Sequence, residues 1–124
     1  MSKPIAYQAR AVVQVQVSDF KRSVAWFKEM LGFEEEYVME EMGWGELRTD
    51  VPGFTIGVSV NPEAQASGAV TVVLSVDDIA AARGWLESKG VKFDGPTDEI
   101  PGMVRLATFR DPDNNPFMFS QSLS

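Results

Sequence analysis

Apolar and polar residues alternate near the start of the chain in a way that predicts a strand. From Val13 to Val17 valine occupies every second position and glutamine the positions between, as in a strand with one face in a core. Large apolar residues then recur at spacings of four and three, which is typical of an amphipathic helix. The helix is expected to begin after Ser18 or Asp19, either of which can cap it, and to end at Gly32. Its apolar stripe consists of Phe20, Val24, Phe27 and Leu31.

The remainder of the first half predicts three more strands. They cover residues 33–39, 44–49 and 54–60, and a Val-Pro-Gly turn at 51–53 separates the last two. Residues 61–68 are polar and small, so we expect them to form a linker.

The second half repeats this order of elements. The pattern predicts a strand at 69–76, a helix that is capped by Asp77 or Asp78 and ends at Gly90, and then three strands. The first of these begins at residues 91–93, and the others cover 103–110 and 116–121, with turns at 99–102 and 111–115.

The two halves also agree in spacing. Asp19 and Asp78 lie 59 residues apart, and the segments 43–47 and 102–106 keep the same separation. Each half is therefore predicted to be a strand–helix–strand–strand–strand repeat. On this alignment Glu46 and Arg105 occupy equivalent positions.

Composition narrows the chemistry that is possible. The 124 residues are enough for one domain, and 18 acidic against 11 basic residues give a formal net charge of −7. This balance argues against a nucleic-acid partner, and no apolar run approaches the roughly 20 residues that span a bilayer, so no membrane partner is expected. Cysteine and histidine are both absent, which excludes thiolate metal sites, cysteine nucleophiles and the commonest general base. Without a signal-peptide pattern, we expect a cytoplasmic protein.

Several short motifs resemble the vicinal oxygen chelate superfamily, which includes glyoxalase I, extradiol dioxygenases, methylmalonyl-CoA epimerase and the bleomycin and fosfomycin resistance proteins. The resemblance covers roughly residues 10–122. Its most specific segments are residues 17–19, 23–27 and 31–33 in the first half and 76–79 and 111–116 in the second. The last of these, Asp-Pro-Asp-Asn-Asn-Pro, is similar to the family's D-P-D-G-N-P turn, with Asn114 in place of glycine.

The resemblance implies an α+β fold in which two tandem βαβββ modules form a curled mixed sheet cup with helices outside. The first module is expected at about 10–60, the linker at 61–68 and the second module at about 69–122, within one domain that spans residues 1–124. The resemblance also implies a homodimer, with modules that pair within a chain or exchange between chains.

Enzymes of this family hold one divalent metal ion with four side chains, one from each of four strands. The corresponding positions here are Val12, Gly57 (or Ile56 in a shifted register), Thr71 and Met118. Valine and glycine offer no ligand atom, and a hydroxyl or thioether is a poor ligand for such an ion. We therefore expect no metal site and no cofactor. A site built only from carboxylates, such as Glu46, Asp50 and the acidic residues at 111–113, stays open, although the latter more simply form a turn.

Alternation along the strands predicts which side chains line the cup. Leu47 and Leu106 are expected to face the helices, so their neighbours, including Met103, Arg105 and Ala107, face the cup. The candidate ligand-binding residues are Gln14, Gln16, Trp44, Glu46, Arg48, Thr71, Ser75, Arg105 and Met118. The other residues expected to face the cup are Val12, Thr55, Gly57, Ser59, Val73 and Ser120.

Three of these candidates leave alternatives open. Glu46 and Arg105 can form a charged pair at the centre of the cup, in which Arg105 binds an anionic or carbonyl group and Glu46 orients it or acts as a base. They can equally be a structural ion pair or two solvated charges. Trp44 can bind a ligand or simply fill the core.

Three functions are compatible with this pattern. The first is a metal-independent protein that binds a small organic molecule, as in the antibiotic-sequestering members of the family. The second is a lyase, isomerase or dioxygenase-type enzyme with an unconventional or metal-free site that uses Glu46. The third is a ligand-sensing or partner-binding module. The sequence does not decide whether the protein is an enzyme.

Overall fold

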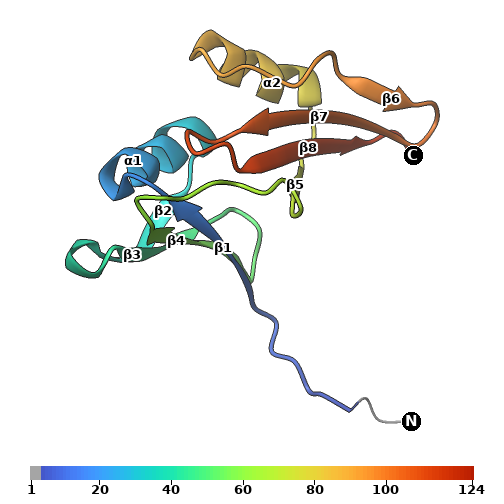
Figure 1. The fold of residues 1–124 in the computed structure, drawn as a ribbon. Coiled ribbons are helices and arrows are strands. Elements are labelled where there is room, and N and C mark those ends of the chain that lie inside the picture. The colour runs from blue at the N-terminus through green and yellow to red at the C-terminus, as the bar shows by residue number, and fades with distance from the viewer. Residues whose placement is uncertain (1–3) are drawn as a thin grey trace. The chain divides into compact units, whose positions relative to one another are not determined.

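The structure is a computed structural model that describes residues 4–124 (Figure 1). The chain divides into two compact units, one that ends at Pro62 and one that begins at Glu63. Each unit contains one α-helix and one four-stranded mixed sheet in the order βαβββ. The predicted α+β class with two tandem βαβββ modules is confirmed, while the single domain spanning the whole chain stays a prediction.

The first sheet has the strand order β1-β4-β3-β2. Strand β1 runs parallel to β4, and the other neighbours are antiparallel. A short 3-10 turn, η1, joins β2 to β3. The elements are β1 (Ala11–Val17), α1 (Phe20–Leu31), β2 (Glu34–Met39), η1 (Glu40–Met42), β3 (Trp44–Arg48) and β4 (Phe54–Val60).

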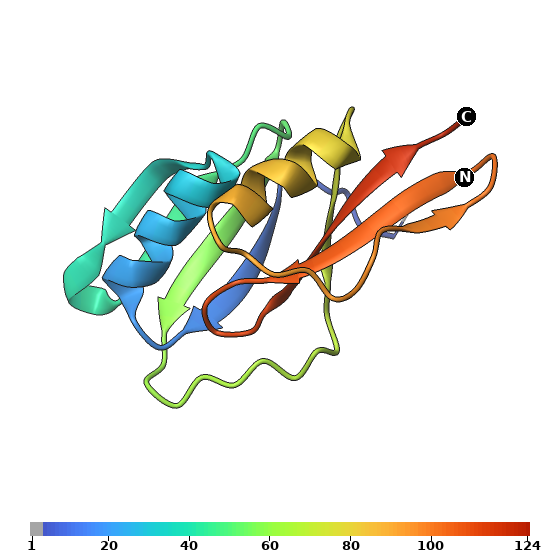
Figure 2. The same ribbon diagram turned by 90° about the horizontal axis from the view of Figure 1, so that it is seen from above.

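Helix α1 lies across one face of this sheet (Figure 2) and has the bounds that the sequence predicts. Asp19 caps it, because its carboxylate accepts a hydrogen bond of 3.1 Å from the backbone N–H of Arg22. Gly32 ends it with a φ of 72°, a left-handed conformation that glycine adopts at little cost. The buried apolar side chains of the helix and the sheet form the core of the unit, namely Phe20, Val24, Phe27, Val15, Val17, Leu47, Ile56 and Val58.

The second sheet has the equivalent order β5-β8-β7-β6, with β5 parallel to β8. Its helix is capped by Asp78, whose carboxylate accepts from the backbone N–H of Ala81 at 3.0 Å. Phe109, Phe117 and Phe119 pack against one another on the α2 side of the sheet, with ring centroids 4.8 to 5.8 Å apart. The elements are β5 (Val72–Ser75), α2 (Ile79–Ser88), β6 (Asp98–Ile100), β7 (Val104–Arg110) and β8 (Pro116–Ser122).

The second unit departs from the prediction between α2 and β7. The strand expected at 91–93 is reduced to an isolated bridge between Phe93 and Phe109, and the pairing strand is β6, where a turn was predicted. Gly95, with a φ of 80°, turns the chain directly after Phe93, and Pro96 has no N–H to continue a ladder. The strand therefore resumes only at Asp98.

The Asp-Pro-Asp-Asn-Asn-Pro segment is a hydrogen-bonded turn. The buried carboxylate of Asp111 accepts from the backbone N–H groups of Asp113 and Asn115 and from the side-chain amide of Asn115, at 2.7 to 3.0 Å. Burial raises the pKa of Asp111, although these hydrogen bonds act in the opposite direction. Asn114 takes the left-handed conformation, with a φ of 70°. The Asp111 carboxylate therefore stabilises the turn.

Candidate functional site

The candidate site lies on the side of the first sheet that points away from α1, which we call the distal face. Strand register fixes its members, because paired residues share a face. Gln14 pairs with Gly57 and Gly57 with Glu46, while Leu47 pairs with Ile56 on the α1 side. The side-chain orientations predicted for β1, β3 and β4 are therefore confirmed. Besides those three residues, these strands place Val12, Gln16, Trp44, Arg48, Thr55 and Ser59 on this face.

An aromatic pair occupies the middle of the distal face. The indole Nε1 of Trp44 donates a hydrogen bond of 2.8 Å to the hydroxyl of Tyr37 on β2. A Cβ atom built on Gly57 would lie only 2.9 Å from Cη2 of Trp44, so the ring rests against a backbone that has no side chain. Trp44 is thereby fixed at one end by Tyr37 and accommodated at the other by Gly57.

Side-chain amides lie beside this pair. Gln14 donates to the Ser59 hydroxyl at 2.8 Å, and Gln16 accepts from the Asn61 amide at 3.2 Å. Both glutamines are exposed. The aromatic pair therefore has polar groups within the same face that can orient a bound molecule.

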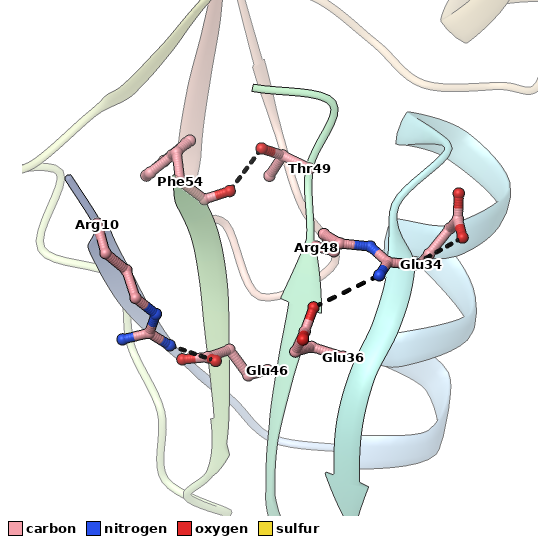
Figure 3. A network of polar contacts seen from close by, with 7 residues as sticks. All are labelled: Arg10, Glu34, Glu36, Glu46, Arg48, Thr49 and Phe54. Atoms are coloured by element: carbon pink, nitrogen blue, oxygen red, sulfur yellow. Dashed lines mark hydrogen bonds and ion pairs between the residues drawn. The ribbon is translucent and has the colours of Figure 1, made fainter. Parts of the chain in front are cut away.

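Charged side chains occupy the end of the distal face next to the turn at 49–53. Figure 3 shows the Arg10 guanidinium directed at Glu46, with 2.6 Å between Nη2 and Oε2. The Glu46 side chain is 5% exposed, whereas that of Arg10 is 53% exposed. Arg48 forms ion pairs with Glu34 at 2.9 Å and with Glu36 at 3.7 Å. Both arginines are thus already held by carboxylates.

A pocket of about 320 Å³ is lined by two threonines and by the charged residues Arg10, Glu36, Glu46, Arg48 and Asp50. Thr49 donates to the carbonyl of Phe54 at 2.7 Å and accepts from the N–H of Val51 at 3.1 Å. Within residues 4–124, the hydroxyl of Thr55 is the one buried side-chain polar atom without a hydrogen-bond partner. The two threonines have the same exposure, 8%, but their hydroxyls differ in that Thr49 is hydrogen-bonded and Thr55 has no partner.

Two members of this site were missed as candidates from the sequence. Tyr37 reaches the distal face because the β2–β3 register shifts between Glu35 and Tyr37. Arg10 precedes the predicted strand and carries no periodic signal. Thr55 was predicted to face the cup, but alternation alone does not show that its hydroxyl lacks a partner.

The distal face of the second sheet is partly as predicted. Val73 pairs with Met118 and Ser75 with Ser120, opposite to Phe117 and Phe119 on the α2 side. Thr71 is exposed and lies just before β5. These pairings confirm the side-chain orientations predicted for β5 and β8.

The orientation predicted for β7 is wrong. Arg105 and Ala107 share the α2 face with Phe109, because Ala107 pairs with Phe119 in an unbroken register. Leu106 lies instead on the distal face. Met103, which was also predicted to face the cup, precedes the strand in a turn.

An insertion explains this error. Leu47 pairs with Ile56 in the first sheet as Phe109 pairs with Phe117 in the second, so the true spacing in the third strand is 62 residues (109 − 47) and not 59. The second unit has three additional residues between Asp78 and β7. Because this number is odd, an alignment that overlooks them assigns every side chain of β7 to the opposite face of the sheet.

Glu46 and Arg105 are consequently not equivalent. The counterpart of Glu46 is Thr108, which pairs with Met118 as Glu46 pairs with Gly57. Each charge also has a partner within its own unit, because Arg105 donates to Glu99 at 2.8 Å across the β6–β7 pair. This correction removes Arg105 from the candidate ligand-binding residues.

The residues at the family's metal-ligand positions do not fit a metal ion. A side chain at position 57 would meet Trp44 at 2.9 Å and Val12 at 3.3 Å from its first carbon. In the part of the chain that the structure describes, residues 4–124, no three Asp, Glu, His or Cys side chains gather into a cluster that could hold a metal ion. The site offers an aromatic ring, hydrogen-bonding groups and charged side chains. Within the same residues, no helix is long and apolar enough to cross a membrane.

Comparison with known proteins relates the chain to one superfamily. The model of the Glyoxalase/Bleomycin resistance protein/Dioxygenase superfamily matches residues 10–119. The uncharacterized protein YraH of Bacillus subtilis (strain 168) is 28% identical over 115 residues, which covers 83% of this chain and 90% of that protein.

Two solved structures illustrate the similarity in fold. TnmS3, an antibiotic binding protein from Streptomyces sp. CB03234, has a TM-score of 0.78 at 23% identity, over 98% of this chain and 99% of that one. A superfamily member from Sphaerobacter thermophilus DSM 20745 has a TM-score of 0.79 at 23% identity, over 95% and 98% of the two chains. At such identities the similarity is one of fold alone.

Proposed function

The chain belongs to the Glyoxalase/Bleomycin resistance protein/Dioxygenase superfamily, and we propose that it binds a small planar organic molecule on the distal face of its first sheet without a metal ion. The observation that carries this proposal is the placement of Trp44. Its indole ring is fixed by Tyr37 and lies against Gly57, a position where the family's enzymes carry a metal ligand.

A fixed aromatic ring is well suited to binding. Stacking of a planar ligand on an aromatic side chain contributes about 0.5–1.5 kcal/mol beyond the burial of apolar area. Because the hydrogen bond to Tyr37 already restrains the indole, less side-chain entropy is lost when a ligand binds. Gln14, Gln16, Glu46 and Arg48 lie on the same face as the ring and supply the sparse polar groups typical of ligand sites.

Similarity to an antibiotic binding protein also supports a binding function. TnmS3, which carries that description, shares the fold over nearly its whole length. Thr71, Ser75 and Met118 of the second unit stay predicted ligand contacts. The homodimer implied by the resemblance also stays a prediction, which light scattering can test.

The experiment is a titration followed by ¹⁵N–¹H NMR, in which the indole N–H groups of the three tryptophans report separately. The probes are 2-naphthol, 1,4-naphthoquinone and anthraquinone-2-sulfonate. We expect saturable shifts of the Trp44 indole and of the Gly57 amide, and none of the Trp85 indole on α2. Trp44→Phe identifies the signal and weakens binding, and Trp85→Phe is the matched control.

Two results would contradict the proposal. If no probe moves the Trp44 signal, the distal face is not the binding site. If Mg²⁺, Mn²⁺, Zn²⁺ or Ni²⁺ binds stoichiometrically and is required for the shift, binding is not metal-independent.

A further inference from the structure

The pocket at the end of the distal face contains a polar group that the fold itself leaves unused. Thr55 is 8% exposed, lines the pocket, and its hydroxyl has no hydrogen-bond partner within residues 4–124. A buried hydroxyl without a partner destabilises the folded state, whereas valine would have nearly the same shape without that cost. Thr49, which is equally buried in the same pocket, makes both of its hydrogen bonds.

A second polar group with spare capacity lies next to Thr55. Glu46 pairs with Gly57, two residues along β4 from Thr55, so the two side chains are diagonal neighbours on one face. Oε2 of Glu46 is bound by Arg10, and within the described chain Oε1 accepts no hydrogen bond. The pocket therefore presents one hydroxyl and one carboxylate oxygen that are both available.

The charged side chains that line the pocket favour some ligand groups over others. Three acidic residues line it, Glu36, Glu46 and Asp50, against two arginines that are both engaged in ion pairs. A carboxylate or phosphate would face a net negative wall. A hydroxyl group matches better, because it can donate to the carboxylate and accept from the threonine at the same time.

We propose that this pocket is a subsite for a hydroxyl group carried by the aromatic molecule that binds at Trp44, with the hydroxyl donating to Glu46 and accepting from Thr55. This inference rests on the proposed function. Gly57, beneath the indole, is two residues from Thr55 along an extended strand, which is about 7 Å. A two-ring molecule stacked on Trp44 is long enough to place its hydroxyl in the pocket.

The test compares 2-naphthol with 2-methoxynaphthalene, which lacks the donor, by calorimetry and by the NMR titration above. We expect the protein to bind 2-naphthol about tenfold more tightly, as for one hydrogen bond to a charged group. Thr55→Val is expected to weaken the binding of 2-naphthol, because the ligand oxygen loses the hydrogen bond from Thr55. The ether oxygen of 2-methoxynaphthalene can accept the same hydrogen bond, so its affinity should fall as well, while the preference for 2-naphthol, which depends on Glu46, is kept. Thr55→Ser restores both affinities, and unchanged affinities in Thr55→Val would exclude Thr55 from the subsite.

Thr49→Val is the matched control, since it removes a hydroxyl from the same pocket. It is expected to lower the melting temperature by about 3 °C or more, because two hydrogen bonds are lost, and to retain the affinity for both probes. Thr55→Val is expected to keep or raise the melting temperature, which separates a loss of binding from a loss of folding.

Each contrary outcome points to a specific failure. Equal affinities for the two probes, with the Trp44 signal still shifting, would overturn the hydroxyl subsite and leave the proposed function intact. Tighter binding of 2-(aminomethyl)naphthalene or of 2-naphthoate than of 2-naphthol would assign the pocket to a cation or to an anion instead. If none of the probes shifts Trp44, the subsite and the proposed function fail together.

Discussion

The two sheets share strand order and pairing, yet their distal faces carry different chemistry. The central row of the first sheet is Gln14, Gly57 and Glu46, and that of the second is Val73, Met118 and Thr108. Trp44 corresponds to Leu106. The first face therefore offers an indole and amides where the second offers aliphatic, thioether and hydroxyl groups.

The helix-facing sides differ far less in character. Leu47 and Ile56 in the first unit and Phe109 and Phe117 in the second are all completely buried and apolar. Packing against a helix restricts this side to residues that fill the core, whereas the distal side is under no such restriction. The comparison indicates that one backbone plan carries a common core on one face and a specialised surface on the other.

The largest loss of stability is expected from a substitution at Phe109, the buried residue of β7 that is equivalent to Leu47. Phe109→Ala should cost about 3–5 kcal/mol of unfolding free energy, because it empties the centre of the second core. Leu106→Ala should cost about 1 kcal/mol or less, since Leu106 is half-buried on the distal face. Urea unfolding measures both, and similar losses would contradict the register described for β7.

A substitution at Gly57 tests the contact between this glycine and the Trp44 ring, which distinguishes the first distal face from the second. Gly57→Ala places a methyl group 2.9 Å from the Trp44 ring, so we expect a loss of about 1–3 kcal/mol from overpacking and a shift of the Trp44 indole signal. Trp44→Ala in the same protein should relieve the collision. If the double variant is no more stable than expected from the two single variants, the ring does not rest on Gly57.

The two buried threonines should respond in opposite directions. Thr49→Val is expected to lose about 1–3 kcal/mol, because it leaves the Phe54 carbonyl and the Val51 N–H without their partner. Thr55→Val is expected to change stability by less than about 0.5 kcal/mol or to increase it. Thermal unfolding without ligand makes the comparison, and an equal loss in both variants would mean that Thr55 is bonded in solution.

Asp111 should make the stability of the second unit sensitive to pH. Its folded pKa is raised above the ordinary value of an aspartate, mainly by burial, so the folded state holds its proton to higher pH than the unfolded state. The contribution of this group to stability therefore falls as pH rises from the unfolded through the folded pKa. The difference in unfolding free energy between the protein and Asp111→Asn should therefore change with pH across that window, and a pH-independent difference would contradict the raised pKa.

The smallest effect is expected at Arg105. Its ion pair with Glu99 is half-exposed on both sides, at 44% and 46%, so Arg105→Ala should cost less than about 1 kcal/mol. Because Arg105 lies on the α2 face, the substitution should also leave the affinity for 2-naphthol unchanged. A clear loss of affinity would return this residue to the binding site.

Sequence reasoning succeeded where local signals act alone. The capping residue Asp19 and the terminal Gly32 fixed the bounds of α1, and alternation oriented the side chains of β1, β3 and β4. The side-chain orientation predicted for β7 was wrong, because an alignment that assumes a constant spacing of 59 residues cannot detect three inserted residues.

Other features depend on contacts between distant residues. The register shift that brings Tyr37 to Trp44 belongs to the β2–β3 pair and not to either strand alone. The partnerless hydroxyl of Thr55 becomes visible only when every neighbour is in place. The internal repeat of the sequence therefore predicted the backbone plan more fully than the chemistry of its surfaces.

The contact between Trp44 and Gly57 has an evolutionary consequence. An acidic side chain introduced at position 57 would meet the indole before it could reach an ion, and a smaller residue at position 44 alone would supply no ligand. A metal ligand at position 57 therefore requires two substitutions, one at each of these positions.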